Sequence, residues 1–412
     1  MTPEFRIFPL ATVLFCALAG VAAANVAEDA RGRVRDRLQA ERQRIEALAD
    51  GVGSRMPVPE GAVDVVKTSG VPNDGKVGAA QAINEAIRSA AGRPLYFPEG
   101  IYLLDDSIRP LSGTKLYLSP RAEMRRGFNG GNGDGRGALI QGAPSFAVND
   151  VTVAGGNWTN PDHVYSGRVL TVIGSRWVVD SLRVTSWAPA QGTSSCVNLA
   201  GDDLTLRNCV LTGSARLINQ DGIRVMCGAR IRISDCYVES GDDCFCAFPT
   251  ETRQGALSGR ELSDVAFERC FGFSTAARFL ACGETAVSVF LGKATMPQLN
   301  AVRVHGITFT DCVGMSLATV AHAPAFFVVS ADTNPGASVA EVRFAGCVGV
   351  GGTAAAQGAL LNAAPGARCS GLTLEKCEIF GGQKETLSIT RTCTAVRIVD
   401  CRLDGVLSNQ SR

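Results

Sequence analysis

The sequence predicts an all-β fold, a single-stranded right-handed parallel β-helix (solenoid) with an N-terminal cap helix. Three observations predict it: a short motif that recurs along the chain, short steps between its copies, and a glycine-rich composition. The motif is an apolar residue, a second apolar residue two positions later and a cysteine three positions after that. Apolar residues two apart share one face of a strand, so each copy is interpreted as a strand of one coil.

The spacing of the copies favours a coil over other repeat folds. Their last positions lie 24 to 42 residues apart, and repeats of about 20–50 residues form solenoids, propellers or arrays. A propeller blade needs four strands in about 40 residues, which the shortest steps cannot hold. Seven copies end in cysteine and two upstream copies end in an aliphatic residue: Leu204-Leu206-Cys209, Ile231-Ile233-Cys236, Val265-Phe267-Cys270, Ile307-Phe309-Cys312, Val342-Phe344-Cys347, Leu372-Leu374-Cys377, Val396-Ile398-Cys401, Phe146-Val148-Val151 and Trp177-Val179-Leu182.

Composition agrees with thin, stacked coils. The chain has 412 residues, of which 46 are glycine, 46% are hydrophobic and only 6% are aromatic. A solenoid grows by repetition, so this length fits one domain, expected over residues 56–412. The net charge is +1 and no basic run stands out, so nucleic acid is not an expected partner. The sequence indicates no particular oligomeric state.

The N-terminus resembles an export signal. Arg6 precedes an apolar stretch over residues 7–24, which ends in three alanines. We therefore expect a signal peptide over residues 1–24, a secreted or periplasmic protein and no stable membrane insertion; an uncleaved membrane anchor is the alternative. Residues 25–55 are expected to be helical and amphipathic, packed on the solenoid end rather than on a membrane.

The cysteines predict an interior ladder. Seven of the fourteen beyond Cys16 occupy the same slot of the repeat, where a buried thiol acts as a small apolar side chain. No CxxC cluster suggests a metal site, so neither a metal nor a cofactor is predicted. Cys369 and Cys393 each stand three residues before the motif in neighbouring repeats, within reach of a disulfide, and that bridge stays open.

The start of the coil resembles a known superfamily. A short helix is expected from Ala79 to Ile87, and the segment Phe97-Pro98-Glu99-Gly100-Ile101-Tyr102 follows it. Both features resemble the entry of the pectate-lyase-type β-helix superfamily, where a helix covers the open end of the coil. Such a cover is needed because an open end would expose a cross-section of the core.

Two acidic motifs lie about one repeat apart. They are Asn219-Gln220-Asp221-Gly222 and Gly241-Asp242-Asp243, so Asp221 precedes the aspartate pair by 21 and 22 residues. In a coil of that period the three carboxylates converge on one face. Converging carboxylates suit general acid and base chemistry on a glycosidic bond. A second Gly-Asp-Asp, at residues 201–203, has a different spacing from its ladder cysteine, so we interpret it as a turn.

The two motifs resemble those of glycoside hydrolase family 28, the polygalacturonases, which carry Asn-Thr-Asp and Gly-Asp-Asp on adjacent turns; Cys244 also matches. The resemblance implies an inverting hydrolase in which Asp242 is the general acid and Asp221 and Asp243 hold the attacking water. It also implies that Asn219 contacts the substrate. Stacked carboxylates cannot all ionise freely, which raises the pKa of at least one of them.

The chain departs from this family beside the motifs. The family's Gly-His-Gly is missing: counting from Cys270 sets Ala277 level with Asp243, with Arg278 next to it. Its Arg-Ile-Lys, which would bind a uronate carboxylate, is missing too, so simple galacturonan is not the expected substrate. Arg278 could bind an anionic sugar group, abstract a proton or pair with an aspartate.

Trp187 and the longer loops complete the expected site. Trp187 could stack on a sugar ring or pack within its loop. Charged loop residues that could contact substrate are Glu251, Arg253, Arg260, Glu261, Glu284 and Lys293. The prediction is an exported glycosidase acting on a polysaccharide or oligosaccharide. Its alternatives are a Ca²⁺-dependent lyase in which the aspartates bind the ion and Arg278 is the base, or a non-catalytic carbohydrate-binding protein.

Overall fold

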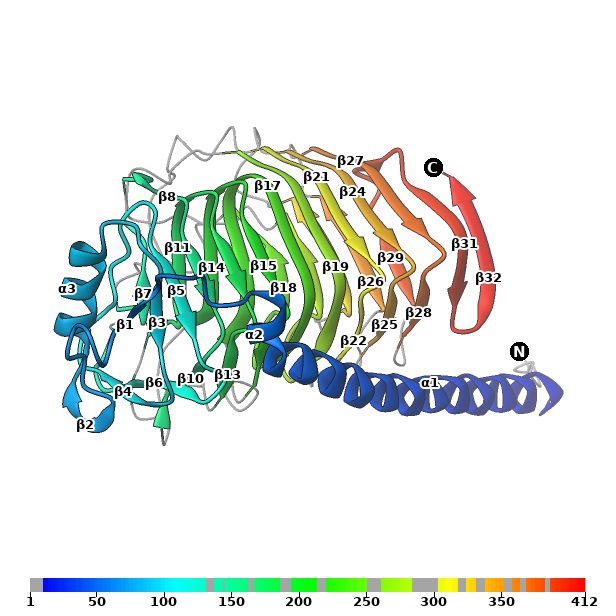
Figure 1. Cartoon of the computed structure of the whole chain (residues 1–412). Coiled ribbons are helices and arrows are strands. Elements are labelled where there is room, and N and C mark those ends of the chain that lie inside the picture. The colour runs from blue at the N-terminus through cyan, green and yellow to red at the C-terminus, as the bar shows by residue number, and fades with distance from the viewer. Residues whose placement is uncertain are drawn as a thin grey trace, which may run out of the picture.

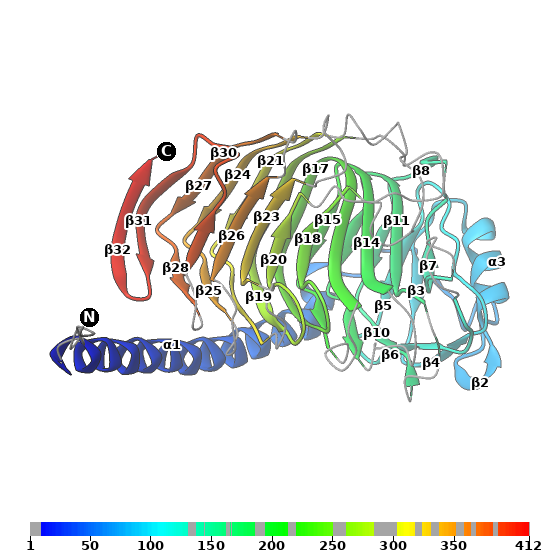
Figure 2. The same ribbon diagram turned by 180° about the vertical axis from the view of Figure 1, so that it is seen from behind.

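Every turn of the chain adds up to three short strands to three stacked parallel faces (Figures 1 and 2), which confirms the parallel β-helix. The computed structural model describes residues 10–130, 137–143, 145–161, 165, 167–185, 194–212, 220–249, 261–283, 303–317, 324–330, 338–351, 358–363, 368–381 and 386–411. We call the faces first, second and third in the order in which the chain visits them from β12 onward.

The first face pairs strands that carry the cysteine motif. Its strands are β1 (Val63–Asp64), β3 (Leu95–Phe97), β5 (Lys115–Leu118), β9 (Thr152–Ala154), β12 (Val178–Asp180), β15 (Thr205–Arg207), the middle of β17 (Gln220–Ser240), β19 (Leu262–Ser274), β21 (Arg303–Thr310), β24 (Ser338–Ala345), β27 (Arg368–Glu375), β30 (Cys393–Thr394) and β31 (Arg397–Leu403).

The second face follows after a bend in each turn. Its strands are β2 (Asp74–Gly78), β4 (Gly100–Leu104), β6 (Ala122–Arg126), β10 (Asn157–Thr159), β13 (Arg183–Thr185), β16 (Val210–Leu211), the ends of β17 and β19, β22 (Val313–Ser316), β25 (Val348–Val350), β28 (Glu378–Phe380) and the end of β31. The last strand, β32 (Val406–Ser411), pairs antiparallel with β31 and closes the coil's C-terminal end with a hairpin.

The third face holds the acidic motifs. Its strands are β7 (Ile140–Gln141), β8 (Val148–Asn149), β11 (Leu170–Ser175), β14 (Ser194–Asp202), the start of β17, β18 (Phe245–Ala247), β20 (Leu280–Cys282), β23 (Phe326–Ser330), β26 (Ala359–Ala363) and β29 (Leu387–Ile389).

Stacked side chains of one kind fill the core. The seven ladder cysteines are at most 1% exposed, and Cys236 pairs in register with Cys270, which confirms the ladder. Beside it the rings of Phe267, Phe309 and Phe344 stack at centroid distances of 4.8 Å. The fourteen described cysteines are all free thiols.

Two details of the predicted repeat need comment. Cys369 and Cys393 are register partners, as expected, but both are buried thiols without a disulfide between them. The copy placed at Phe146 is wrong, because Val179 pairs with Val153 rather than with Val148. Val148, Val151 and Val153 are all buried, so apolar character alone did not define the frame there.

The cap helix is confirmed. Helix α3 (Ala80–Ala90) lies across the N-terminal end of the coil, where Ile83, Ala86 and Ile87 join the core. Its last turn ends at Ala91, a residue with φ of 51°, which turns the chain back into β3.

Helix α1 (Leu10–Asp50), followed by α2 (Val52–Arg55), lies along the flank of the coil and not on its end (Figure 1). Val34, Leu38 and Ile45 pack on outward apolar side chains of the second face, contributed by Val210, Tyr237, Phe271, Val313, Met315, Val350 and Phe380. The expected end position was wrong because this apolar stripe crosses many turns and needs a long cover. Among the described residues, no helix is long and apolar enough to span a membrane.

Candidate functional site

The site lies where the strands of the third face begin. Ser195 of β14 pairs with Asp221 of β17. The pairing of Ile223 with Phe245 then sets Asp221 level with Asp243 on the next turn. Parallel register therefore brings the two predicted acidic motifs together, as the spacing indicated.

Gly222 of the first motif has no room for a side chain. A Cβ on Gly222 would overlap the Val238 side chain and the carbonyl oxygen of Cys244. The chain crosses over the core here at close range, and this approach lets Asp221 and Asp243 face each other. The Asp-Gly pair is therefore part of the site's construction.

The Asp221 carboxylate is buried, 5% exposed, and fully engaged. Its Oδ2 accepts from Ser195 Oγ at 3.1 Å and forms an ion pair with Arg224 Nη2 at 2.7 Å. Its Oδ1 accepts from the backbone N–H of Asp243 at 3.4 Å. These contacts engage both oxygens of the Asp221 carboxylate.

Asp243 is 1% exposed and is paired with Arg278. The guanidinium donates from Nε to Oδ1 at 2.5 Å and from Nη2 to Oδ2 at 2.7 Å, a two-point contact. The guanidinium also lies 4.4 Å from the ring centroid of Phe327 and 5.3 Å from that of Phe248. Of the roles open to Arg278, the structure shows the pairing with an aspartate.

Asp242 differs from its two neighbours. Its side chain is partly exposed and makes no hydrogen bond or ion pair with the described residues. Burial, reinforced by the adjacent charges of Asp243 and Asp221, raises its pKa to about 8, whereas Arg278 and Arg224 partly offset the shift. At neutral pH the group carries a proton next to two anionic carboxylates.

The observed register of Arg278 differs from the one predicted by counting from Cys270. Ser240 pairs with Ser274, an offset of 34, but Phe245 pairs with Leu280, an offset of 35. One extra residue in the intervening bend therefore sets Arg278, not Ala277, level with Asp243.

Two site residues were missed by sequence reasoning. Arg224 stands between the core residues Ile223 and Val225, so strand alternation could have predicted its outward direction, but not its contact with Asp221 three positions earlier. Burial lowers the pKa of Arg224, but Asp221, Cys246 and Asp243 together outweigh burial, so the pKa is raised. Ser195 carried no signal of its own, because only the pairing of β14 with β17 shows that it reaches Asp221.

Most of the other predicted site residues fall outside the part of the chain that the structure describes. Asn219 and Trp187 lie outside the described residues, as do Glu251, Arg253, Arg260, Glu284 and Lys293. Glu261 is described, and it contacts His305 and Arg303 on the first face.

The Gly-Asp-Asp of residues 201–203 forms a turn, as predicted. Asp203 has φ of 57° and pairs with Arg230 on the next turn, with both side chains about half exposed. Asp202 accepts from the backbone N–H of Ala229 at 2.9 Å.

A divalent cation does not fit the carboxylates well. Asp221, Asp243 and Cys246 bring their donor atoms within 4.8 Å of one another. Both aspartates are already neutralised by arginines, however, and burial raises the pKa of the Cys246 thiol far above its usual range. Calcium prefers six to eight oxygen ligands, so this donor set disfavours the ion.

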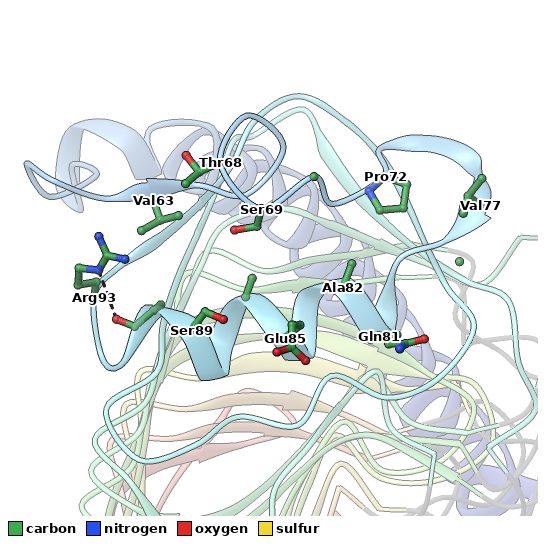
Figure 3. Close-up of a pocket in the computed structure, with 14 residues that line it drawn as sticks. Val63, Thr68, Ser69, Pro72, Val77, Gln81, Ala82, Glu85, Ser89 and Arg93 are labelled. Atoms are coloured by element: carbon green, nitrogen blue, oxygen red, sulfur yellow. Dashed lines mark hydrogen bonds between the residues drawn. The ribbon is translucent and has the colours of Figure 1, made fainter.

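A cavity of about 760 Å³ lies at the cap, between α3 and the segment before it (Figure 3). Gln81, Glu85 and Ser89 of the helix face Thr68 and Ser69 across it. None of the site carboxylates lines this cavity, which is at the far N-terminal end of the coil.

Known proteins share this architecture. The family model described as rhamnogalacturonase A/epimerase, pectate lyase-like, matches residues 63–253. A comparison with curated proteins gave no match.

Solved structures resemble the whole coil at low sequence identity. A hyperthermoactive exopolygalacturonase from Thermotoga maritima has a TM-score of 0.57 and 10% identity, over 89% of this chain and 99% of that one. PfbA, a surface adhesin of Streptococcus pneumoniae, has a TM-score of 0.53 and 14% identity, over 84% and 92%.

A third similar structure is longer. The tailspike gp49 of Acinetobacter baumannii bacteriophage Fri1, a capsular polysaccharide depolymerase, has a TM-score of 0.56 and 8% identity. The match covers 84% of this chain and 60% of the tailspike. Together the matches support a pectate-lyase-like parallel β-helix that resembles an exopolygalacturonase in fold.

Proposed function

We propose that the protein is a glycoside hydrolase that cleaves a polysaccharide with inversion, with Asp242 as the general acid. The carrying observation is the contrast within one cluster: two carboxylates are buried and paired with arginines, and the third is unpaired and partly exposed. A general acid must hold a proton at working pH and reach the leaving oxygen, and Asp242 meets both conditions.

Asp221 and Asp243 have the complementary role of activating the attacking water. As anions they would position the attacking water and accept its proton as the glycosidic bond breaks, while Asp242 gives its proton to the leaving oxygen. Arg224 and Arg278 form ion pairs with these two carboxylates next to the acid. Burial and the neighbouring aspartates raise the pKa of Asp242, and the two arginines partly offset the rise.

The eliminating alternative has less support. A lyase would need Arg278 to take a proton, but its guanidinium is committed to Asp243 through two short hydrogen bonds. The aspartates also offer a poor calcium site, for the reasons given above. Galacturonan stays an unexpected substrate, because Arg278 is engaged with Asp243 and the family's other bases are missing.

Products on a polysaccharide panel test the proposal. Purified protein should release reducing ends without forming an unsaturated sugar that absorbs in the ultraviolet, and the activity should survive a chelator. Its rate should fall as the pH rises through about 8, because the acid then loses its proton. Ultraviolet-absorbing products lost on chelation would establish a lyase instead. Export through residues 1–24 is part of the proposal and is tested by N-terminal sequencing of the mature protein.

A further inference from the structure

The outer side of the third face carries a column of polar side chains next to the acid. Register pairs Gln141 with Thr171, Thr171 with Asn198, and Asn198 with Arg224. Their strand neighbours belong to the core, so all four side chains point outward. The column therefore starts beside Asp221 and runs toward the cap end of the coil.

Three members of this column each hold a buried side-chain oxygen that has no hydrogen-bond partner among the described residues, although Gln141 Nε2 donates to the carbonyl oxygen of Gly142 at 3.1 Å. Thr171 is 4% exposed and Asn198 is 3% exposed. Neither Thr171 Oγ1, Asn198 Oδ1 nor Gln141 Oε1 accepts or donates a hydrogen bond within the described part of the chain. Buried polar groups are rarely left unpaired, and three on consecutive turns indicate a ligand that supplies the partners.

On the C-terminal side of the acid, the outward side chains of the same column are apolar. Continuing the column from Arg224, register gives Cys246, then Ala281, Phe327 and Leu360. These residues form an apolar cluster with Phe248. Among the described residues level with this column, the polar side chains next to the acid lie on the cap side.

We propose that Gln141, Thr171 and Asn198 bind successive units of a neutral, hydroxyl-bearing polysaccharide on the cap side of Asp242. The inference rests on the proposed function and names the substrate class of that same site. None of the three side chains is charged, so they suit hydroxyls rather than carboxylates. Turns are about 4.8 Å apart, which places Asn198 about 10 Å and Gln141 about 19 Å from the turn of Asp242.

Binding can be measured without turnover. Asp242→Asn protein would be run in native gels that contain xyloglucan, arabinogalactan, galactomannan or polygalacturonate. We expect at least one neutral polysaccharide to retard it and polygalacturonate not to. In the same background, Asn198→Ala and Thr171→Val should each weaken affinity about 5- to 10-fold, the loss of one good hydrogen bond.

Stability of the free protein gives a second readout. Removing an unpaired buried polar atom should raise the Tm of Thr171→Val by about 1–3 °C while its glycan affinity falls. Thr308→Val is the matched control, because Thr308 lies on the outer side of the first face, level with Ala266. It should change neither property. Asn362→Ala on β26, beyond the apolar cluster, should leave affinity within twofold.

The outcomes separate the two proposals. Loss of hydrolysis in Asp242→Asn tests the acid, whatever the column does. The column proposal is overturned if only polygalacturonate binds, if no polysaccharide binds, if Thr171→Val and Asn198→Ala retain full affinity, or if Asn362→Ala weakens it as much as Asn198→Ala does.

Discussion

The chain contains Gly-Asp-Asp twice, and the two copies have opposite surroundings. In residues 201–203 the last aspartate forms a half-exposed ion pair at a turn, with Arg230 as its partner. In residues 241–243 the last aspartate is 1% exposed and its arginine, Arg278, is 17% exposed. Both pairs link adjacent turns through two-point contacts of similar length.

The difference shows that position on the coil, not the tripeptide, decides the chemistry. Burial of Asp242, together with the charges of the buried Asp243 and Asp221, raises the pKa of Asp242, and Arg278 and Arg224 partly offset the rise. The equivalent neighbour in the first copy, Asp202, accepts one hydrogen bond from Ala229 at the turn. Each prediction below changes matched residues in the two copies.

The largest expected effect is on catalysis. Asp242→Asn removes the proposed acid and should lower kcat on a responsive polysaccharide by about 10²- to 10⁴-fold. Asp202→Asn is the control, since its amide oxygen can still accept from Ala229, and its kcat should match that of the unmodified protein. Reducing-end assays on both variants measure this. Equal kcat for Asp242→Asn and the unmodified protein would remove Asp242 from the mechanism.

The second effect is on folding stability. Arg278→Ala leaves the Asp243 carboxylate buried without its partner and should cost about 3–5 kcal/mol in free energy of unfolding. Arg230→Ala breaks a pair of the same geometry at the surface and should cost less than about 1 kcal/mol. Urea titrations of both variants give the two values. Similar costs would show that the burial difference does not control the energy of these pairs.

Much of the fold could be predicted because the core repeats. The cysteine ladder places an inward residue on seven turns, and the 22-residue spacing of Asp221 and Asp243 correctly set the two acidic motifs side by side. Counting failed where the bend changed length, so one inserted residue moved Arg278 into the position assigned to Ala277. It also failed at Phe146, where three nearby valines are all buried and the pattern fits two frames.

Partners across turns were harder to predict than positions along a strand. Alternation predicts the outward direction of Arg224 but not its ion pair with Asp221, which stands three positions earlier in the same strand. Ser195 reaches Asp221 from the preceding turn, which depends on a register that no local motif encodes. The course of α1 depends likewise on the apolar stripe of the second face, whose members come from six strands.

The smallest expected effect is the pH dependence of stability. The pKa of Asp242 is raised in the folded protein from 3.8 to about 8, so folding is opposed wherever the unfolded chain would ionise this group. That cost is absent below pH 4, grows as the pH rises from about 4 to about 8, and then stays constant. Asp242→Asn removes the cost and should be more stable than the unmodified protein by roughly 1–3 kcal/mol at pH 8 and by nearly nothing at pH 4.

Asp202→Asn should show no such trend, because Asp202 sits at a turn away from the buried pairs. Unfolding free energies of the three proteins across this pH range measure the comparison. A constant difference between Asp242→Asn and the unmodified protein would mean that the buried pairs do not hold the proton on Asp242.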